Sequence, residues 1–367
     1  MRVCILAGSG MWGLLGAQGR SHGGAELQLY LLGRSLAGDV AHDVTFLVYS
    51  SEAPPGLSVP WGTVSRFVTP VKRGVPVVSR FVNAARLRRS FEQVCADVFV
   101  QSAAHPMTGV AAEQAHRHAR AFVFRLASDA DLDGSNLPDP RERALYLRGL
   151  KGADLIIARS EYQRTELASR YGKDSVIVPN VFAVPPAPPT VEKDSVLWVA
   201  SSRPLKQPDV FLGLARAFPH ERFVMVMPPN DVALFERIRE EARAIPNLDF
   251  VERVPFTEIQ DYFDRAKVFI NTSTVEGFPN TFVQAAMGST PVLSLSVDPD
   301  GVLASGGFGR CAGGDVGRLT SDLGEMLADG RLREEMGRAG FSYAKATHDI
   351  DTVMPRFKEL LSGVVRP

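Results

Sequence analysis

The sequence has few cysteines and no long apolar run. Its 3 cysteines, Cys4, Cys95 and Cys311, lie far apart and lack the spacing of a metal site. We therefore predict neither a disulfide framework nor a cysteine-bound metal, and we expect a reducing, cytoplasmic environment. No apolar stretch approaches the roughly 20 residues that a membrane-spanning helix needs. The chain is therefore not expected to span a membrane.

Neither sign of charge predominates, because 41 Lys and Arg residues balance 41 Asp and Glu residues. Such a balance argues against a nucleic-acid partner. The basic side chains nevertheless cluster in residues 72–89, a stretch without acids that contains Lys72, Arg73, Arg80, Arg86, Arg88 and Arg89. An amphipathic helix there would make a peripheral contact with anionic lipid at the inner face of a membrane. A solvated helix face is the alternative.

The sequence also lacks repeats of solenoid period and low-complexity tracts. At 367 residues, of which 45% are hydrophobic, it exceeds what a single core usually organises. A proline-rich segment at 179–190 interrupts two regular regions. It predicts a stiff linker between two domains, 1–183 and 190–349.

Apolar segments of strand length alternate with helical patterns along most of the chain. Before the linker they lie near 2–7, 44–49, 66–70, 97–102, 121–127, 154–158 and 175–178; after it they lie near 195–200, 222–227, 248–252, 267–271, 290–295 and 309–312. This alternation predicts an α/β protein with one parallel sheet in each domain and right-handed crossover connections.

The most informative segment follows a buried apolar strand in the second region. Gly277 and Pro279 predict a turn, and Asn280 or Thr281 is expected to cap the helix that begins there. The free N–H groups and the dipole of such a helix suit a pyrophosphate or the hydroxyls of a sugar. Glu276 would accept hydrogen bonds from hydroxyl or ammonium donors. An ordinary strand-to-helix connection is the alternative.

This segment resembles the retaining glycosyltransferases of family 4, whose hallmark is two Glu residues separated by seven others on this turn and helix. Here the two positions are Glu276 and Gln284, so the second acid is replaced by an amide. The resemblance implies that Glu276 contacts the donor sugar, that the Phe278–Thr281 backbone contacts sugar or phosphates, and that Gln284 contacts the ribose. An amide oxygen still accepts from a ribose hydroxyl. Glu-Gly-Phe-Pro-Asn-Thr-Phe with this Gln indicates a subgroup of the family.

The resemblance covers nearly the whole chain and implies the GT-B fold, in which two Rossmann-like domains face each other across a cleft. The N-terminal domain would bind the acceptor, residues 190–349 would bind the nucleotide sugar, and the final helix, within 350–367, would cross back onto the N-terminal domain. The implied reaction transfers a hexose-type unit from a nucleoside diphosphate sugar to a hydroxyl of a glycan, glycolipid or small molecule, as in polysaccharide biosynthesis. No metal and no other cofactor is implied.

A second loop, which follows the strand near 195–200, contains two cations. Family members carry Gly-Arg, four residues and Lys at this place, where both cations neutralise the diphosphate. Lys206 matches that Lys, Ser201 falls on the usual Arg position, and Arg203 lies two residues later. The resemblance thus implies that Lys206 and Arg203 stabilise a leaving group whose charge grows as the sugar bond breaks. A solvated basic loop is the alternative.

A glycine-rich loop follows the first strand. Residues 8–13 fit the dinucleotide pattern G-x-G-x-x-G, and Glu52 follows the second strand. In that pattern the third glycine lies in a helix, whereas here glycines continue until a helical period begins near Gly24. The turn at Gly23 and Gly24 resembles the Gly-Gly turn of the family, which implies contact with the donor phosphates or the acceptor. A bound NAD(P) is the alternative.

Polar residues follow two further apolar strands of the first region. Ser128 and Asp129 come after one strand and His105 after another, and ligands of parallel sheets bind beyond the carboxyl ends of strands. We predict that these three residues contact the acceptor or the sugar, with helix capping, turn formation or a structural His as alternatives. The alternating acids at 129–133 open like a calcium loop. Because Pro140 stands where the bidentate Glu is required, we predict no metal there.

Two other classes of function remain open on the sequence. A sugar-nucleotide epimerase shares the fold, and it would need an acid and a base around the sugar but no acceptor groove. A non-catalytic homologue is compatible with the replacement of the second Glu by Gln284.

Overall fold

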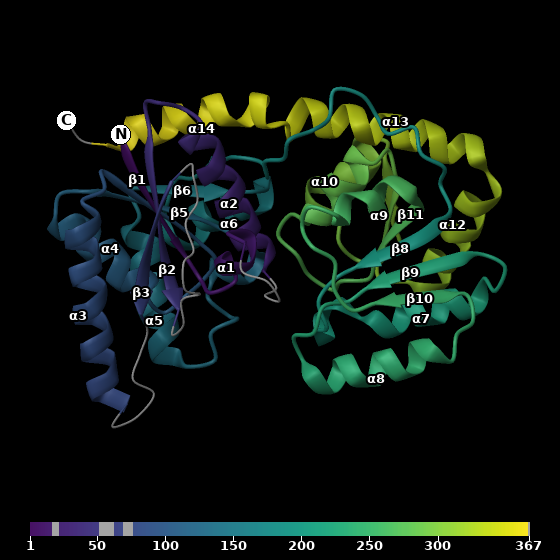
Figure 1. Cartoon of the computed structure of the whole chain (residues 1–367), viewed down its shortest axis with the longest axis horizontal. Coiled ribbons are helices and arrows are strands. Elements are labelled where there is room, and N and C mark those ends of the chain that lie inside the picture. The colour runs from purple at the N-terminus through teal and green to yellow at the C-terminus, as the bar shows by residue number, and fades with distance from the viewer. Residues whose placement is uncertain (17–21, 51–61, 69–75, 366–367) are drawn as a thin grey trace. The chain divides into compact units, whose positions relative to one another are not determined.

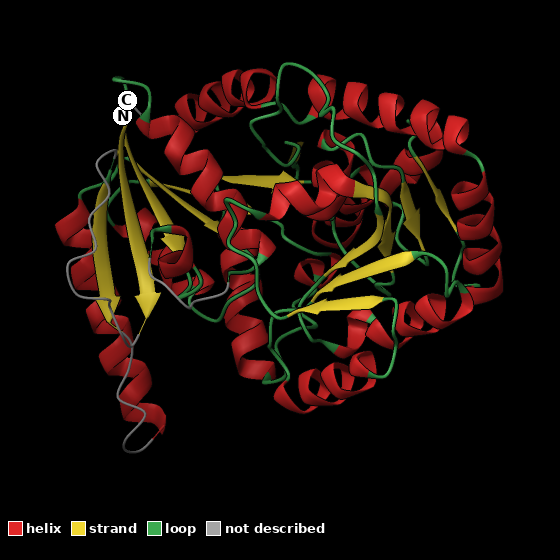
Figure 2. Cartoon of the chain, turned by 45° about the vertical axis from the view of Figure 1, so that its right-hand side comes forward, coloured by secondary structure: helices red, strands yellow, loops and turns green. Residues whose placement is uncertain are grey.

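The computed structural model describes residues 1–16, 22–50, 62–68 and 76–365 of the chain (Figure 1). The chain divides into two compact units. The first unit comprises Met1–Val181 with Ile350–Pro367, and the second comprises Phe182–Asp349. The change between units falls inside the proline-rich segment 179–190. In each unit helices pack around a sheet of strands (Figure 2).

The first unit contains, within the described residues, a seven-stranded sheet with the order β3-β2-β1-β4-β5-β6-β7. All neighbouring strands pair in parallel. The chain moves outward from β1 on one side and then returns to place β4 on the other, and ligands of such sheets bind beyond the carboxyl ends at this reversal. The strands are β1 (Arg2–Ala7), β2 (Asp43–Ser50), β3 (Thr63–Val68), β4 (Val98–Ser102), β5 (Ala121–Arg125), β6 (Leu155–Ala158) and β7 (Val176–Ile177).

Helices follow β1, β3, β4, β5 and β6, as the crossovers of a parallel sheet require, and one more helix comes from the end of the chain. They are α1 (Met11–Leu14), α2 (Gly24–Ala37), α3 (Pro76–Val94), α4 (Thr108–Arg117), the 3-10 helix η1 (Asp129–Leu132), α5 (Pro140–Gly152), α6 (Glu161–Tyr171) and α14 (Ile350–Val364). The last of these, α14, is distant in sequence but packs in the same core as α2.

Side chains of β5 alternate between two buried layers of the first unit. Val123 belongs to the apolar layer that includes α2 and α14, whereas Phe122 and Phe124 belong to the layer that includes α4 and α5. Because side chains alternate along a strand, Arg125 points to the same layer as Val123. A charged side chain therefore enters a layer that is otherwise apolar, and Arg125 is 0% exposed.

The second unit contains, over its described residues, a six-stranded parallel sheet with the order β10-β9-β8-β11-β12-β13. Its strands are β8 (Ser195–Val199), β9 (Arg222–Val226), β10 (Leu248–Val251), β11 (Ala266–Asn271), β12 (Val292–Ser294) and β13 (Gly309–Cys311). Its helices are η2 (Pro204–Lys206), α7 (Pro208–Ala217), α8 (Val232–Arg243), α9 (Ile259–Arg265), α10 (Asn280–Met287), η3 (Pro299–Gly301), α11 (Val302–Ser305), α12 (Val316–Ala328) and α13 (Gly330–Thr347).

The predicted α/β class with one parallel sheet per unit is confirmed. A strand occurs near every predicted position, and only the ends differ. The strand predicted near 66–70, for example, begins at Thr63 because Thr63–Val68 pairs with β2. Strand ends are set by pairing with a neighbour, which local apolar runs do not encode.

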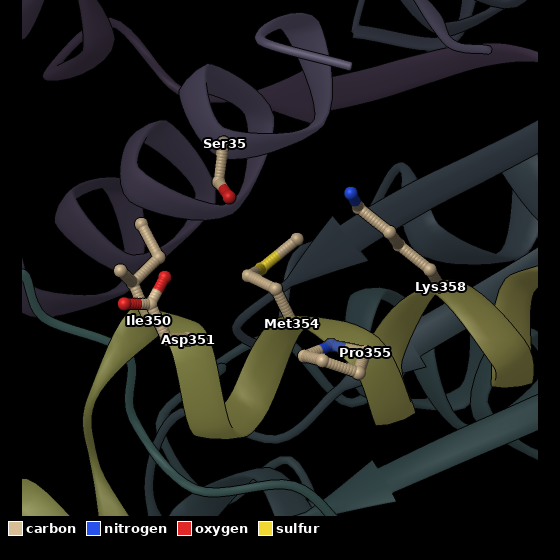
Figure 3. A pocket seen from close by; sticks show the side chains of 6 residues that line it. All are labelled: Ser35, Ile350, Asp351, Met354, Pro355 and Lys358. Carbon is tan, nitrogen blue, oxygen red and sulfur yellow. The ribbon is translucent and has the colours of Figure 1, made fainter.

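A cavity of about 520 Å³ lies within the first unit between α2 and α14 (Figure 3). Ser35 of α2 and five residues of α14 line it: Ile350, Asp351, Met354, Pro355 and Lys358. Lys358 Nζ donates a hydrogen bond to Asp39 Oδ2 at 2.7 Å. None of the predicted site residues lines this cavity.

Candidate active site

Lys206 and Glu276 form an ion pair in the second unit. They are far apart in sequence, but β8 and β11 are neighbours in the sheet. The segments that leave the carboxyl ends of these two strands therefore meet. The two side chains are 16% and 21% exposed, so the pair remains accessible from solvent. The structure thus joins the predicted diphosphate-binding loop to the predicted sugar-binding turn.

Hydrogen bonds hold these two segments against each other. Thr272 Oγ1 accepts from Trp198 Nε1 at 2.8 Å and donates to the carbonyl of Lys206 at 2.5 Å. The backbone N–H of Thr274 donates to the carbonyl of Leu205 at 2.9 Å. Because Trp198 and Thr272 are buried, these bonds are shielded from water. They fix the backbone on which Lys206 is carried.

Glu276 has a second partner on its own loop. Ser273 Oγ donates to Glu276 Oε1 at 2.9 Å, and the Ser273 N–H donates to Asn271 Oδ1 at 3.0 Å. The carboxylate is therefore oriented by a hydroxyl as well as by the Lys206 ammonium. Ser273 was not among the residues expected from the sequence, although it precedes Glu276 by only three positions.

The loop before Lys206 is fixed by Ser202. Its Oγ accepts from the Asn230 N–H at 2.7 Å and donates to the carbonyl of Asp231 at 3.0 Å. Arg203 follows with an exposed side chain, and its N–H donates to the carbonyl of Ser201 at 2.8 Å. Of the two predicted cations, Lys206 faces Glu276, whereas Arg203 lies at the surface of the loop.

The helix after the turn begins where the sequence indicated, but its cap differs from the prediction. Pro279 is the N-cap residue of α10, and no side chain caps the helix. Asn280 and Thr281 are its first residues, so the expected capping by either of them is wrong. A proline with an extended ψ ends the turn and starts the helix by its fixed φ. Gln284 lies one turn further on with a side chain that is 6% exposed.

Phe278 packs inside the second unit. It is 7% exposed, and its ring centroid lies 5.0 Å from that of His348. Its side chain therefore holds the turn in place, and only its backbone remains for contact with a ligand.

The glycine turn of the first unit is filled by a carboxylate. The Gly23 N–H donates to Glu26 Oε2 at 3.2 Å, as in a capping box. A Cβ added to Gly8 or Gly10 would lie 3.1 Å or 3.3 Å from Glu26 Oε1, and one on Gly23 would lie 2.6 Å from Oε2. Glu26 thus occupies the concave backbone where a dinucleotide pattern would place a phosphate. Gly24 begins α2, as predicted.

The expectation that no helix begins before Gly24 is wrong. Gly13 does lie in a helix, the four-residue α1, so the third glycine of the pattern is helical. This helix ends at Leu14, and the long helix α2 begins only at Gly24. Glu52, the predicted acid of the pattern, lies outside the described residues.

Ser128 and Asp129 lie in a capped turn beyond β5. Ser128 is the N-cap of η1, and the buried Asp131 accepts from the N–H groups of Ala127 at 2.6 Å, Ser128 at 3.1 Å and Ala104 at 3.0 Å. Burial raises the pKa of the Asp131 carboxyl. Asp129 Oδ1 accepts from Gln163 Nε2 at 2.8 Å. The turn formation weighed as an alternative is thus present, carried mainly by Asp131.

His105 lies beyond the carboxyl end of β4, as predicted. Burial lowers its pKa to about 4, so the ring is neutral near pH 7. Its Nδ1 accepts from the Met107 N–H at 3.1 Å, and its ring meets that of Tyr49 edge-on at 5.0 Å. The proton of the neutral ring is therefore on Nε2.

Arg125 is the residue of this region that sequence reasoning missed. A charged residue inside the apolar strand predicted near 121–127 was the available signal, because a buried charge needs a partner. Its Nη2 donates to Asn180 Oδ1 at 2.8 Å and to the carbonyl of Pro179 at 3.3 Å.

In the described part of the chain, no group of three His, Cys, Asp or Glu residues could hold a metal ion. No helix in the described ranges is long and apolar enough to cross a membrane. Of the basic stretch 72–89, Lys72 and Arg73 lie outside the described residues, and Arg86, Arg88 and Arg89 of α3 are exposed.

Family models identify both parts of the chain. Residues 22–182 match the model described as Glycosyltransferase Family 4, and residues 194–329 match the model described as Glycosyl transferases group 1. The chain therefore consists of a glycosyltransferase family 4 domain followed by a glycosyl transferases group 1 domain. No curated protein sequence matches it.

Several solved structures have a similar fold. Sucrose-phosphate synthase from Thermosynechococcus elongatus has a TM-score of 0.82 at 14% identity, with 99% of each chain covered. HepE from Anabaena, solved in complex with UDP-glucose, has a TM-score of 0.76 at 15% identity, with 99% of this chain and 100% of that chain covered. WaaG, a glycosyltransferase of lipopolysaccharide biosynthesis, has a TM-score of 0.73 at 14% identity over the same shares. These likenesses confirm the predicted GT-B-like fold.

Proposed function

We propose that this glycosyltransferase retains configuration at the anomeric carbon and transfers a hexose-type unit from a nucleoside diphosphate sugar to a hydroxyl acceptor. The observation that carries the proposal is the Lys206–Glu276 pair at adjacent strand ends, directly before the N-terminus of α10. A cation, an acid and a helix N-terminus are the groups that recognise a diphosphate joined to a sugar.

In this proposal each member of the ion pair exchanges its partner when the donor binds. The Lys206 ammonium moves from Glu276 to the diphosphate, and Arg203, on the same loop, is free at the surface to join it. The Glu276 carboxylate then accepts from sugar hydroxyls while Ser273 continues to orient it. Because Ser273 already orients the Glu276 carboxylate and Thr272 already holds the backbone of Lys206, little reorganisation is needed.

The remaining donor contacts follow from α10. The positive end of the α10 dipole, at the N-terminus that begins with Asn280 and Thr281, suits phosphate oxygens. Gln284, one turn further, would accept from a ribose hydroxyl. We infer that the Gln marks a subgroup of active enzymes, because a hydroxyl can be bound by an amide oxygen as well as by a carboxylate.

The proposed transfer needs no carboxylate pair around the anomeric carbon. The acceptor oxygen attacks from the face that the diphosphate leaves, the bond from anomeric carbon to phosphate oxygen breaks, and that oxygen takes the acceptor proton. Lys206 stabilises the departing charge, which increases towards the transition state. We further propose that His105, Ser128 and Asp129 of the first unit contact the acceptor or the sugar, that Gly23 and Gly24 contact the donor phosphates or the acceptor, and that no metal takes part.

A thermal-shift screen tests the donor first. Uridine, guanosine and adenosine diphosphate sugars are compared, and the true donor raises the melting temperature by mass action. Turnover of that donor is then measured with and without hydroxyl acceptors. Transfer only with an acceptor supports the proposal, epimerised donor without an acceptor indicates an epimerase, and binding without turnover indicates a non-catalytic homologue.

A further inference from the structure

Arg125 in β5 carries buried donors that the described residues do not satisfy. Its Nη2 donates to Asn180 and to the Pro179 carbonyl, but Nε and Nη1 are buried and have no acceptor in the described part of the chain. A guanidinium remains charged in proteins and has five donor hydrogens. Leaving such donors buried and unmatched is costly, so the site calls for an additional acceptor.

A second cation and a hydroxyl lie beside Arg125. Arg159 follows β6, the neighbouring strand, and is 6% exposed. Burial lowers the pKa of Arg125, and the positive charge of Arg159 lowers it further, so the two guanidinium groups interact. Ser102 is the register partner of Arg125 on β4, and its Oγ is buried with no partner in the described ranges. The carboxyl ends of β4, β5 and β6 thus place the donor groups of Ser102, Arg125 and Arg159 near one another.

The acids of this region accept hydrogen bonds from groups other than Arg125, and the positive charge of Arg159 acts on the buried Asp131, whose pKa it lowers against the larger, raising effect of burial. Asp131 accepts from three backbone N–H groups, and Asp129 accepts from Gln163. Asn180 supplies one acceptor to Arg125, through the Nη2 bond described above. No carboxylate of the described residues therefore bonds to the Nε and Nη1 atoms of Arg125.

We propose that Arg125, Arg159 and Ser102 form an oxyanion site that binds a carboxylate or phosphate group of the acceptor. This assignment rests on the proposed transferase function, because it is that function which supplies an acceptor. Two guanidinium groups and a hydroxyl match the several oxygens of an oxyanion, whereas one neutral sugar hydroxyl offers too few lone pairs. The site lies beyond the carboxyl ends of β4, β5 and β6, the edge at which parallel sheets bind ligands.

Because the donors of Arg125 are buried, anion binding at this site should depend only weakly on salt concentration. Because Nε and Nη1 are shielded from solvent, side chains over them must shift to admit the anion, and the resulting pair is weakly screened. Binding of inorganic phosphate should then persist at high sodium chloride concentrations, unlike binding to surface cations.

The first experiment follows thermal unfolding with inorganic phosphate, at constant ionic strength, for the wild type, Arg125→Met and Arg117→Met. Arg117 is an exposed arginine of the same unit, ion-paired with Glu113, and serves as the matched control. We expect a saturable phosphate stabilisation in the wild type and in the control, and its loss in Arg125→Met. General salting-out stabilisation affects all three proteins alike. Equal phosphate stabilisation in all three, or none in the wild type, would overturn the site.

If Arg125→Met does not fold, Arg159→Gln takes its place in the same comparison. It keeps a hydrogen-bonding side chain and removes one charge. We expect its apparent Kd for phosphate to rise by about 10-fold to 100-fold, the range of one lost hydrogen bond to a charged group. An unchanged Kd in Arg159→Gln would count against the site.

The second experiment compares transfer to glucuronate, glucose 6-phosphate and glucose. We expect one acidic acceptor to exceed glucose by about 10-fold or more in kcat/KM, and the ratio to fall towards one in Arg125→Met. Preference for glucuronate identifies a carboxylate, and preference for glucose 6-phosphate identifies a phosphate. Equal use of all three overturns the site but leaves the transferase function standing. If no nucleotide sugar is turned over, the proposed transferase function is refuted. The phosphate-binding experiment then still tests whether Arg125 and Arg159 bind an anion.

Discussion

Lys206→Ala removes the cation that we assign to the donor diphosphate. The loss of one preorganised charge typically costs about 3 kcal/mol of transition-state stabilisation, which corresponds to roughly a 100-fold lower turnover. The effect should be seen in kcat with saturating donor, because the charge of the leaving group grows after binding.

The same change should have little effect on stability. The two side chains of the Lys206–Glu276 pair are 16% and 21% exposed, so water screens part of their attraction. Partly exposed ion pairs contribute at most about 1 kcal/mol to folding. The melting temperature should therefore change by only a few degrees while turnover falls about 100-fold.

Lys267→Ala is the matched control within the same unit. Lys267 Nζ lies 2.7 Å from Glu221 Oε2, and these side chains are 25% and 27% exposed, close to the values of the first pair. We expect a similar small loss of stability and unchanged turnover. The reasoning fails if Lys206→Ala retains near-wild-type kcat, or if Lys267→Ala loses as much activity as Lys206→Ala.

Three further predictions concern the site and its surroundings. Gln284→Glu should keep or modestly strengthen nucleotide binding, whereas Glu276→Gln should impair transfer more than binding; titration calorimetry and turnover assays check both, and equal losses of affinity without loss of turnover would contradict the two assignments. Thr272→Val leaves the buried Trp198 Nε1 without its acceptor and should lower the free energy of unfolding by about 1–3 kcal/mol, measured by urea denaturation. His105 has a folded pKa of about 4, below the ordinary value of 6.5, so the unfolded chain binds more protons between these pH values and stability is lost as pH falls from 6.5 to 4. His105→Gln should flatten this part of the pH profile, and an unchanged slope would show that the ring is not buried as a neutral base.

Local patterns predicted the elements well because each depends on its own residues. The apolar run near 267–271 became β11 (Ala266–Asn271), and the glycines before Gly24 delayed α2, as expected from strand burial and helix propensity. The cap of α10 was not predicted, because Asn280 and Thr281 are good caps only when the chain enters the helix at their position. Pro279, with its fixed φ, made that entry one residue earlier.

The main residues of the candidate site could be predicted from the sequence, but the hydrogen bonds that hold them could not. Glu276 and Lys206 could be selected from the turn and loop patterns, whereas Ser273, Thr272 and Trp198 were recognisable only once their hydrogen bonds were seen. A serine or threonine in a loop is compatible with many partners, and sequence spacing alone does not choose among them.

By itself the sequence determined the α/β class, the positions of the strands and the glycine, proline and charged residues of the loops, because these follow from periodicity and backbone freedom. Only the tertiary structure decided which loops meet. The order of strands in a sheet places β8 beside β11 and so brings Lys206 to Glu276. It also places β5 beside β4 and β6, where Arg125 gathers with Ser102 and Arg159. Strand order arises from packing between distant segments, and no local pattern contains it.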